Sequence, residues 1–168
     1  MNNRIKAICT VPLPYPNPRA EKPDLSYARM LSVAYAGQSG ELASVLQYRY
    51  AHVVCRGIKP KILSEVFSYI AETEMRHLEL LGALICALGG APRFQSDRGA
   101  FSATGLQYAV SPEKLLAAAV EREKNAVALY DRLIKNIKDA SVTAVLLRIA
   151  KDEAHHMKIF EELIAEMA

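Results

Sequence analysis

The sequence predicts an all-α protein, a bundle of four long helices with a long crossover between the second and third helices. Apolar residues recur with the helical period along four segments of about 25–30 residues, and no strand pattern competes with them. A loop of about twenty residues separates the second segment from the third. With 168 residues, of which 51% are apolar and 23% charged, the chain has the length and composition of one globular domain.

Residues 1–23 are predicted to form an extended, proline-rich N-terminal arm. Prolines at five positions between 12 and 23 exclude a helix there, because proline lacks an amide donor and restricts the residue before it. We expect the arm to lie across the body of the protein or to reach a neighbouring subunit. Residues 24–168 then form the bundle, as two helix pairs at about 24–90 and 111–168.

The first helix is predicted to begin at Asp24 or Ser26, because either side chain can cap a helix N-terminus. It is expected to continue to about Cys55. Two glycines in its middle, Gly37 and Gly40, weaken it locally, so we expect a kink or a close helix contact there.

The second helix is predicted to start near Pro60 and to end near Leu88. Residues 91–110 show no sustained periodicity, and they are explained if they travel the length of the bundle to bring in the next helix from the opposite end. That third helix has a strong start at Ser111, followed by a proline and an acid. Asp139 or Ser141 opens the fourth helix.

The second and fourth helices each carry a Glu-x-x-His motif on the apolar face, Glu74 to His77 and Glu153 to His156. Residues three apart on a helix point in nearly the same direction, about 4.5 Å apart along the axis. Each motif therefore presents a carboxylate and an imidazole to one place in the interior, where unpaired charge is costly. A metal ion is the first candidate for the missing partner.

The two halves of the chain repeat each other, and the repeat adds two carboxylates. Glu41 is followed by Tyr48 after seven residues, and Glu123 is followed by Tyr130 at the same spacing. The offset is 82 residues for these features and 79 for the Glu-x-x-His motifs, so a three-residue change in one loop accounts for the difference. Both tyrosines either donate hydrogen bonds to the carboxylates or are core residues of amphipathic helices.

The repeat also resolves two ambiguous choices. Glu123 is favoured over Glu121, and His156 over His155, because only the favoured residues keep the repeated spacing and lie on the apolar face. Four acidic residues fall off these faces and are interpreted as solvated surface charges: Glu72, Glu79, Glu121 and Asp152.

Six groups are thus predicted to hold metal: Glu41, Glu74, His77, Glu123, Glu153 and His156. Four carboxylates carry four negative charges, and imidazoles bind metal when neutral, so two divalent cations balance the site. Oxygen and imidazole ligands without thiolate suit iron or manganese and tolerate zinc.

Charge and composition bear on the other partners. The net charge of +3 comes without a dense basic run, so no nucleic-acid partner is expected. No stretch approaches the roughly 18 apolar residues of a membrane span, and the start lacks the apolar core of a signal peptide, so a cytoplasmic protein is expected. The three cysteines form no Cys-x-x-Cys pair and are interpreted as reduced structural residues.

From about residue 26 onward the pattern resembles the ferritin-like di-metal carboxylate superfamily. Residues 39–43 followed by Gln47 and Tyr48 are similar to the first helix of manganese catalases and their spore-coat relatives. The two Glu-x-x-His segments are similar to that branch and to rubrerythrins. The resemblance implies that Glu74 and Glu153 bridge two metals, that the other two glutamates are terminal ligands, and that each histidine binds one metal.

By the same resemblance, the expected function is that of a dinuclear manganese or iron oxidoreductase acting on hydrogen peroxide, like a catalase or a peroxidase. Two alternatives stay open. One is a ferroxidase or iron-handling protein, with dioxygen and ferrous iron as substrates. The other is a non-enzymatic, metal-stabilised assembly or coat component with the arm as its contact. A homo-oligomer is expected in each case.

Overall fold

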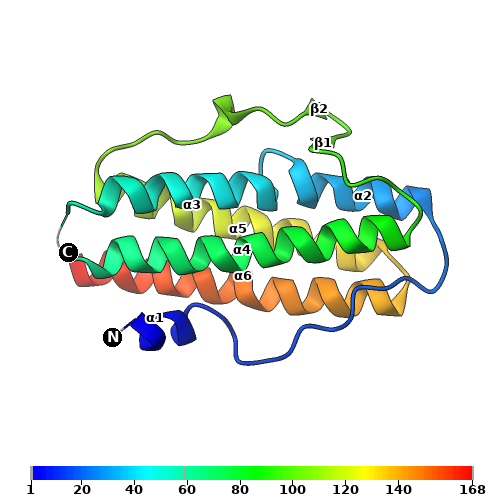
Figure 1. Cartoon of the computed structure of the whole chain (residues 1–168), viewed down its shortest axis with the longest axis horizontal. Helices are drawn as coiled ribbons and strands as arrows, with labels where there is room; N and C mark the ends of the chain where they lie inside the picture. The colour runs from blue at the N-terminus through cyan, green and yellow to red at the C-terminus, as the bar shows by residue number, and fades with distance from the viewer. Residues whose placement is uncertain (1, 59, 168) are drawn as a thin grey trace.

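A computed structural model describes residues 2–58 and 60–167 and shows a bundle of long helices (Figure 1). The predicted all-α four-helix bundle is confirmed. Its helices are α2 (Leu25–Ala36) and α3 (Glu41–Cys55), which follow one another along one edge, then α4 (Ile62–Ala87), α5 (Pro112–Asn136) and α6 (Ala140–Met167). A short helix, α1 (Asn2–Ile8), precedes them, and the crossover carries β1 (Gln95–Ser96), β2 (Gly99–Ala100) and the 3₁₀ turn η1 (Ala103–Gly105).

The apolar core is divided into two clusters along the bundle axis. α3 packs mainly on α4, and α5 on α6, so each half of the repeat forms a helical hairpin. One cluster lies towards the α2 end and includes Leu31, Leu81, Leu84, Leu146 and Ile149. The other lies towards the end that carries both termini and includes Phe67, Ile70, Leu116, Ala119 and Phe160. The predicted metal-binding positions fall between the two clusters.

The first predicted helix is not continuous, which corrects the expectation of one helix to Cys55. It breaks between Ala36 and Glu41, where Gly37 and Gly40 take extended conformations. A Cβ atom at Gly40 would lie 2.4 Å from the carbonyl oxygen of Ala34. The chain therefore passes too close to α2 for any side chain at this position. The break makes Glu41 the first residue of α3.

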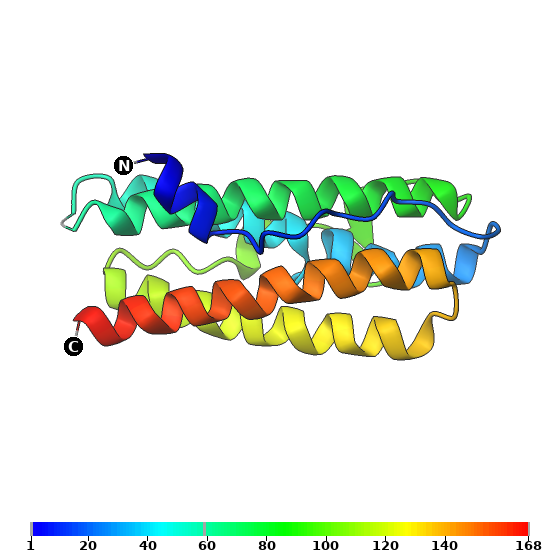
Figure 2. The ribbon, with the colours of Figure 1, turned by 90° about the horizontal axis from the view of Figure 1, so that it is seen from below.

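The N-terminal arm lies across the body of the protein and contacts both α4 and α6 (Figure 2). The prediction of an extended conformation was wrong for residues 2–8, which form α1. Ile5 and Cys9 lie four residues apart and are both buried, so one face of this short segment packs into the core. Residues 9–23 contain no helix.

The crossover travels along the outside of the bundle from the end of α4 to the start of α5, as its length implied (Figure 1). It is held to α3 by two hydrogen bonds between Gln47 and the backbone of Gln107, of 2.8 and 2.7 Å. Ser111 caps α5, and Asp139 rather than Ser141 caps α6 by accepting two backbone amides. Within the described residues, no helix has the length and apolarity needed to cross a membrane.

The close approach at the break predicts a measurable loss of stability in Gly40→Ala. The new methyl group would collide with backbone atoms, which cannot move aside as a flexible side chain can, so we expect a loss of about 1–3 kcal/mol. Gly57→Ala is the matched control, since a Cβ there meets nothing within 4 Å. Urea denaturation of both variants measures the difference, and equal stabilities would contradict the inferred contact.

Candidate metal centre

All six residues predicted from the repeat lie together in the middle of the bundle. Every one of them is buried, with five completely inaccessible and Glu41 exposed by only 2%. Four helices contribute: α3 supplies one glutamate, α5 another, and α4 and α6 each supply a glutamate and a histidine. The polar band they form separates the two apolar clusters.

The six side chains form two overlapping groups of four. Within each group, every residue offers one potential ligand atom, and these atoms lie within 4.8 Å of one another. The first group is Glu41, Glu74, His77 and Glu153, and the second is Glu74, Glu123, Glu153 and His156. Glu74 and Glu153 belong to both groups. This is the arrangement needed if two carboxylates are shared between two neighbouring ions and each half adds its own glutamate and histidine.

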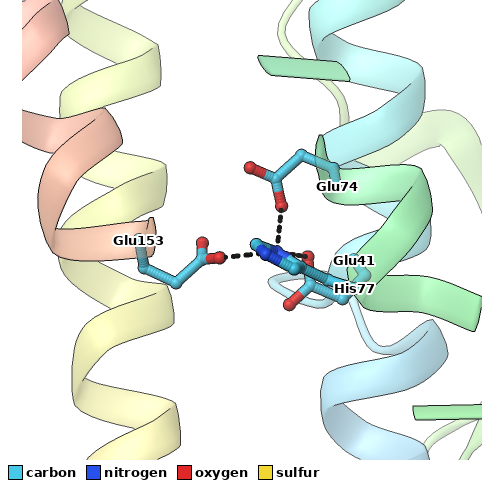
Figure 3. A group of neighbouring side chains, drawn as sticks. All are labelled: Glu41, Glu74, His77 and Glu153. Carbon is cyan, nitrogen blue, oxygen red and sulfur yellow. Dashed lines mark hydrogen bonds and ion pairs between the residues drawn. The ribbon is translucent and has the colours of Figure 1, made fainter. Parts of the chain in front are cut away.

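In the first group, the imidazole of His77 lies between carboxylates from three helices (Figure 3). Its Nδ1 atom is 2.9 Å from Glu153 Oε1, 3.3 Å from Glu74 Oε2 and 3.8 Å from Glu41 Oε2. In the second group, His156 Nδ1 is 2.8 Å from Glu74 Oε1. Both histidines therefore turn the same ring nitrogen towards the shared glutamates.

Several of these atoms have no adequate partner in the protein. Six buried side-chain atoms of the described residues make no hydrogen bond of acceptable geometry, and five of them are Glu74 Oε1, Glu123 Oε2, both oxygens of Glu153, and His156 Nδ1. Buried polar atoms without partners are costly and are rare in folded proteins. Oxygen and nitrogen atoms that converge in this way fit divalent cations, so the cluster is compatible with a dinuclear metal site.

The outer nitrogen of each histidine is fixed by a hydrogen bond. His77 Nε2 donates to Asp152 Oδ2 at 3.1 Å, and His156 Nε2 donates to the carbonyl oxygen of Cys9 at 3.0 Å. A neutral imidazole that donates through Nε2 keeps its lone pair on Nδ1, which faces the centre. The tautomer that a metal requires is thus set by the surroundings.

The two tyrosines donate hydrogen bonds to carboxylates and are also buried core residues, so both roles that the sequence left open apply. Tyr48 donates to Glu123, and Tyr130 donates to Glu41. Each tyrosine therefore binds the glutamate of the other half of the repeat. Seven residues along a helix cover about 10 Å, so each hydroxyl is too far from its own glutamate and reaches the one on the neighbouring helix.

Asp152 corrects one interpretation of the sequence, because it is completely buried rather than a solvated surface charge. It accepts hydrogen bonds from Tyr15 and from the amide of Val11, at 2.5 and 2.9 Å, and lies 2.7 Å from Nη1 of Arg148. The hydroxyl of Tyr15 is also 3.3 Å from His77 Nε2. Tyr15 and Arg148 were not predicted from the sequence. The four-residue spacing of Arg148 and Asp152 was an available signal of an ion pair.

Burial and crowding change the acidity of these groups. Burial, together with the neighbouring charge of Glu74, raises the pKa of Glu41 to about 8 and that of Glu153 to about 8. Burial acts in the same direction on Glu74, but the facing imidazoles of His156 and His77 outweigh it and hold the pKa of Glu74 below its usual value. The metal-free centre therefore keeps protons in place of positive ions.

Fold and site together define a helical-bundle protein with a buried carboxylate and histidine cluster compatible with two metal ions. The chain belongs to the ferritin family of ferritin-like domains, whose pattern matches residues 37–168. This confirms the resemblance seen in the motifs. Among curated proteins, no sequence matches the chain significantly.

Solved structures with the same fold include a manganese catalase, a bacterioferritin and a thioferritin. The manganese catalase KatB from Anabaena superposes with a TM-score of 0.85 at 23% identity, covering 94% of this chain and 79% of its own. The Desulfovibrio desulfuricans bacterioferritin, which has a diiron site, superposes with a TM-score of 0.71 at 21% identity, covering 99% of this chain and 84% of its own. The dodecameric thioferritin of Bacteroides fragilis superposes with a TM-score of 0.73 at 20% identity, covering 99% of this chain and 95% of its own. At these identities the likeness establishes the fold.

Metal affinity is expected to increase as the pH rises towards 8. The raised pKa values of Glu41 and Glu153 mean that both carboxyls hold protons at neutral pH, and a metal must displace them. Each proton released weakens binding by up to about tenfold for every pH unit below the pKa. Calorimetric titration with Mn²⁺ in buffers of different ionisation enthalpy measures this release. A metal affinity that does not change between about pH 6 and 8 would contradict the expected protonation.

Proposed function

We propose that the protein binds two manganese or iron ions per chain at these six residues and uses them to remove hydrogen peroxide. The observation that carries the proposal is the pair of overlapping ligand groups that share Glu74 and Glu153. In this assignment the shared glutamates would serve both ions, while Glu41 with His77, and Glu123 with His156, would complete the two positions.

Charge supports two ions rather than one. Four buried glutamates carry four negative charges when ionised, and two divalent cations balance them. Asp152 adds a fifth buried carboxylate, but its ion pair with Arg148 already neutralises it. A single ion would leave part of the glutamate charge to be balanced by bound protons, as in the metal-free centre, whereas two ions balance it without them.

The chain's own residues give the site its shape. Tyr48 and Tyr130 hold the two terminal glutamates by their hydrogen bonds, and the outer contacts of the histidines fix both ring orientations. The apolar clusters on either side limit access of water. When bound, a pair of redox-active ions supplies the change of oxidation state that the conversion of peroxide to water and oxygen requires.

Peroxide removal is preferred over the alternatives because of the structural comparison. The fold agrees with that of a manganese catalase over 94% of this chain with a TM-score of 0.85, above the values for the bacterioferritin and the thioferritin. Iron oxidation is the second candidate, supported by the likeness to a bacterioferritin with a diiron site. A homo-oligomer is also proposed, since one similar protein is dodecameric.

The proposal is tested by metal analysis paired with activity. Protein purified without added metal, and protein reconstituted with Mn²⁺ or Fe²⁺, should contain about two ions per chain by elemental analysis. Oxygen release from peroxide supports the catalase reaction, whereas rapid ferrous oxidation with retained mineral supports iron handling. Less than one metal per chain after reconstitution with either metal would overturn the dinuclear site.

The bridging assignment is tested by the double variant Glu74→Ala with Glu153→Ala. Removing both shared carboxylates should abolish binding of both ions, because each position loses two of its ligands. The control is Glu79→Ala with Glu121→Ala, which removes two exposed glutamates and should leave metal content unchanged. Full metal binding by the first variant would refute the assignment.

A further inference from the structure

The two halves of the repeat match at the predicted ligands, but they differ at the residues that surround those ligands. In each half, one residue immediately precedes the shared glutamate: Thr73 in α4 and Asp152 in α6. Both side chains are buried, at 7% and 0% exposure. Asp152 accepts a hydrogen bond from the histidine of the other half, His77, whereas within the described residues Thr73 makes no hydrogen bond to either ligand histidine. The hydroxyl of Thr73 instead bonds to Thr10 at 2.9 Å and to the backbone of its own helix.

The two histidines therefore have acceptors of different charge. His77 donates to the carboxylate of Asp152, and His156 donates to the neutral backbone carbonyl of Cys9. A carboxylate draws the Nε2 proton more strongly than a carbonyl does, and it makes the opposite ring nitrogen a better donor to a cation. The two ligand groups have the same composition, since each has its own glutamate, its own histidine and the same two shared glutamates.

The N-terminal arm holds Asp152 in this position. The amide of Val11 and the hydroxyl of Tyr15 both donate to its carboxylate. Arg148 completes the contact, because it pairs with Asp152 and also donates to the carbonyl oxygens of Val11 and Leu13, at 2.7 and 3.0 Å. Its guanidinium group lies 4.2 Å from the centre of the Tyr15 ring. The carboxylate thus has few ways to turn away from His77.

We propose that the two metal positions are unequal, and that Asp152, fixed by the arm, makes the position of His77 the one that binds the first ion more tightly. This inference rests on the proposed dinuclear site. Asp152 and Tyr15 are positioning residues in this arrangement, since they act on the metal only through His77. The position of His156 has a neutral acceptor and fills second.

The test is a stepwise titration of metal-free protein with Mn²⁺, in which free Mn²⁺ is followed by electron paramagnetic resonance. The wild-type protein should bind in a tight step and a weaker step. Asp152→Asn keeps the size of the side chain and a hydrogen-bond acceptor but removes the charge. It should weaken the tight step by about 10–100-fold and leave the weaker step little changed.

Thr73→Val is the matched control, because it alters the equivalent position of the repeat and removes a hydroxyl that also bonds to the arm. Both steps should stay as in the wild type. Two further variants identify the positions: His77→Gln should remove the tight step, and His156→Gln the weaker one. Tyr15→Phe keeps the ring beside Arg148 but removes the hydroxyl that contacts both Asp152 and His77, and should weaken the tight step alone.

The outcomes separate this inference from the proposed function. No binding by the wild-type protein would overturn the dinuclear site itself. Two ions bound by the wild type with equal affinity, or an unchanged tight step in both Asp152→Asn and Tyr15→Phe, would leave the dinuclear site standing and overturn the inequality. An equal loss in Thr73→Val would overturn the role of Asp152. Circular dichroism of each metal-free variant verifies that the helices are retained.

Discussion

The burial of four carboxylates between two apolar clusters is the constraint on which the rest of this structure depends. Charged groups are normally excluded from such a core, and here four carboxylate oxygens and Nδ1 of His156 make no hydrogen bond of acceptable geometry. The fold concentrates this cost in one layer instead of spreading it along the bundle. On either side, the helices pack through ordinary apolar contacts, which provide the stability that the polar layer does not.

The tyrosines show how the two halves of the repeat are joined. If each hydroxyl bonded to the glutamate of its own helix, each of the hairpins α3–α4 and α5–α6 would position its own carboxylates without the other hairpin. Tyr48 and Tyr130 bond across the bundle instead, so each half positions a carboxylate of the other. Both rings belong to the core as well as to the polar layer, since both are almost completely buried. Packing of the apolar clusters and placement of the carboxylates are therefore coupled.

The six clustered residues and the crossover could be predicted because helical periodicity and the internal repeat report directly on which residues face inward. The break before Glu41 could not be distinguished from a kink, since the close approach of Gly40 to Ala34 depends on tertiary packing. Asp152 was misassigned for a related reason. It falls off the apolar stripe of α6, but its carboxylate contacts His77 of α4 on one side and the arm, through Val11 and Tyr15, on the other. Periodicity within a helix carries no information about a non-helical segment that packs on it.

The position of the arm in the chain constrains the order in which contacts can form during synthesis. Val11 binds Asp152 across a separation of 141 residues, and Ile8 and Cys9 bind His155 and His156 across 147. During synthesis the arm therefore leaves the ribosome well before its partners on α6. Until α6 has been made, the arm has no surface on that helix to bind, although the α3–α4 hairpin can already form. The outer contacts of His77 and His156 can thus form only after α6 has emerged.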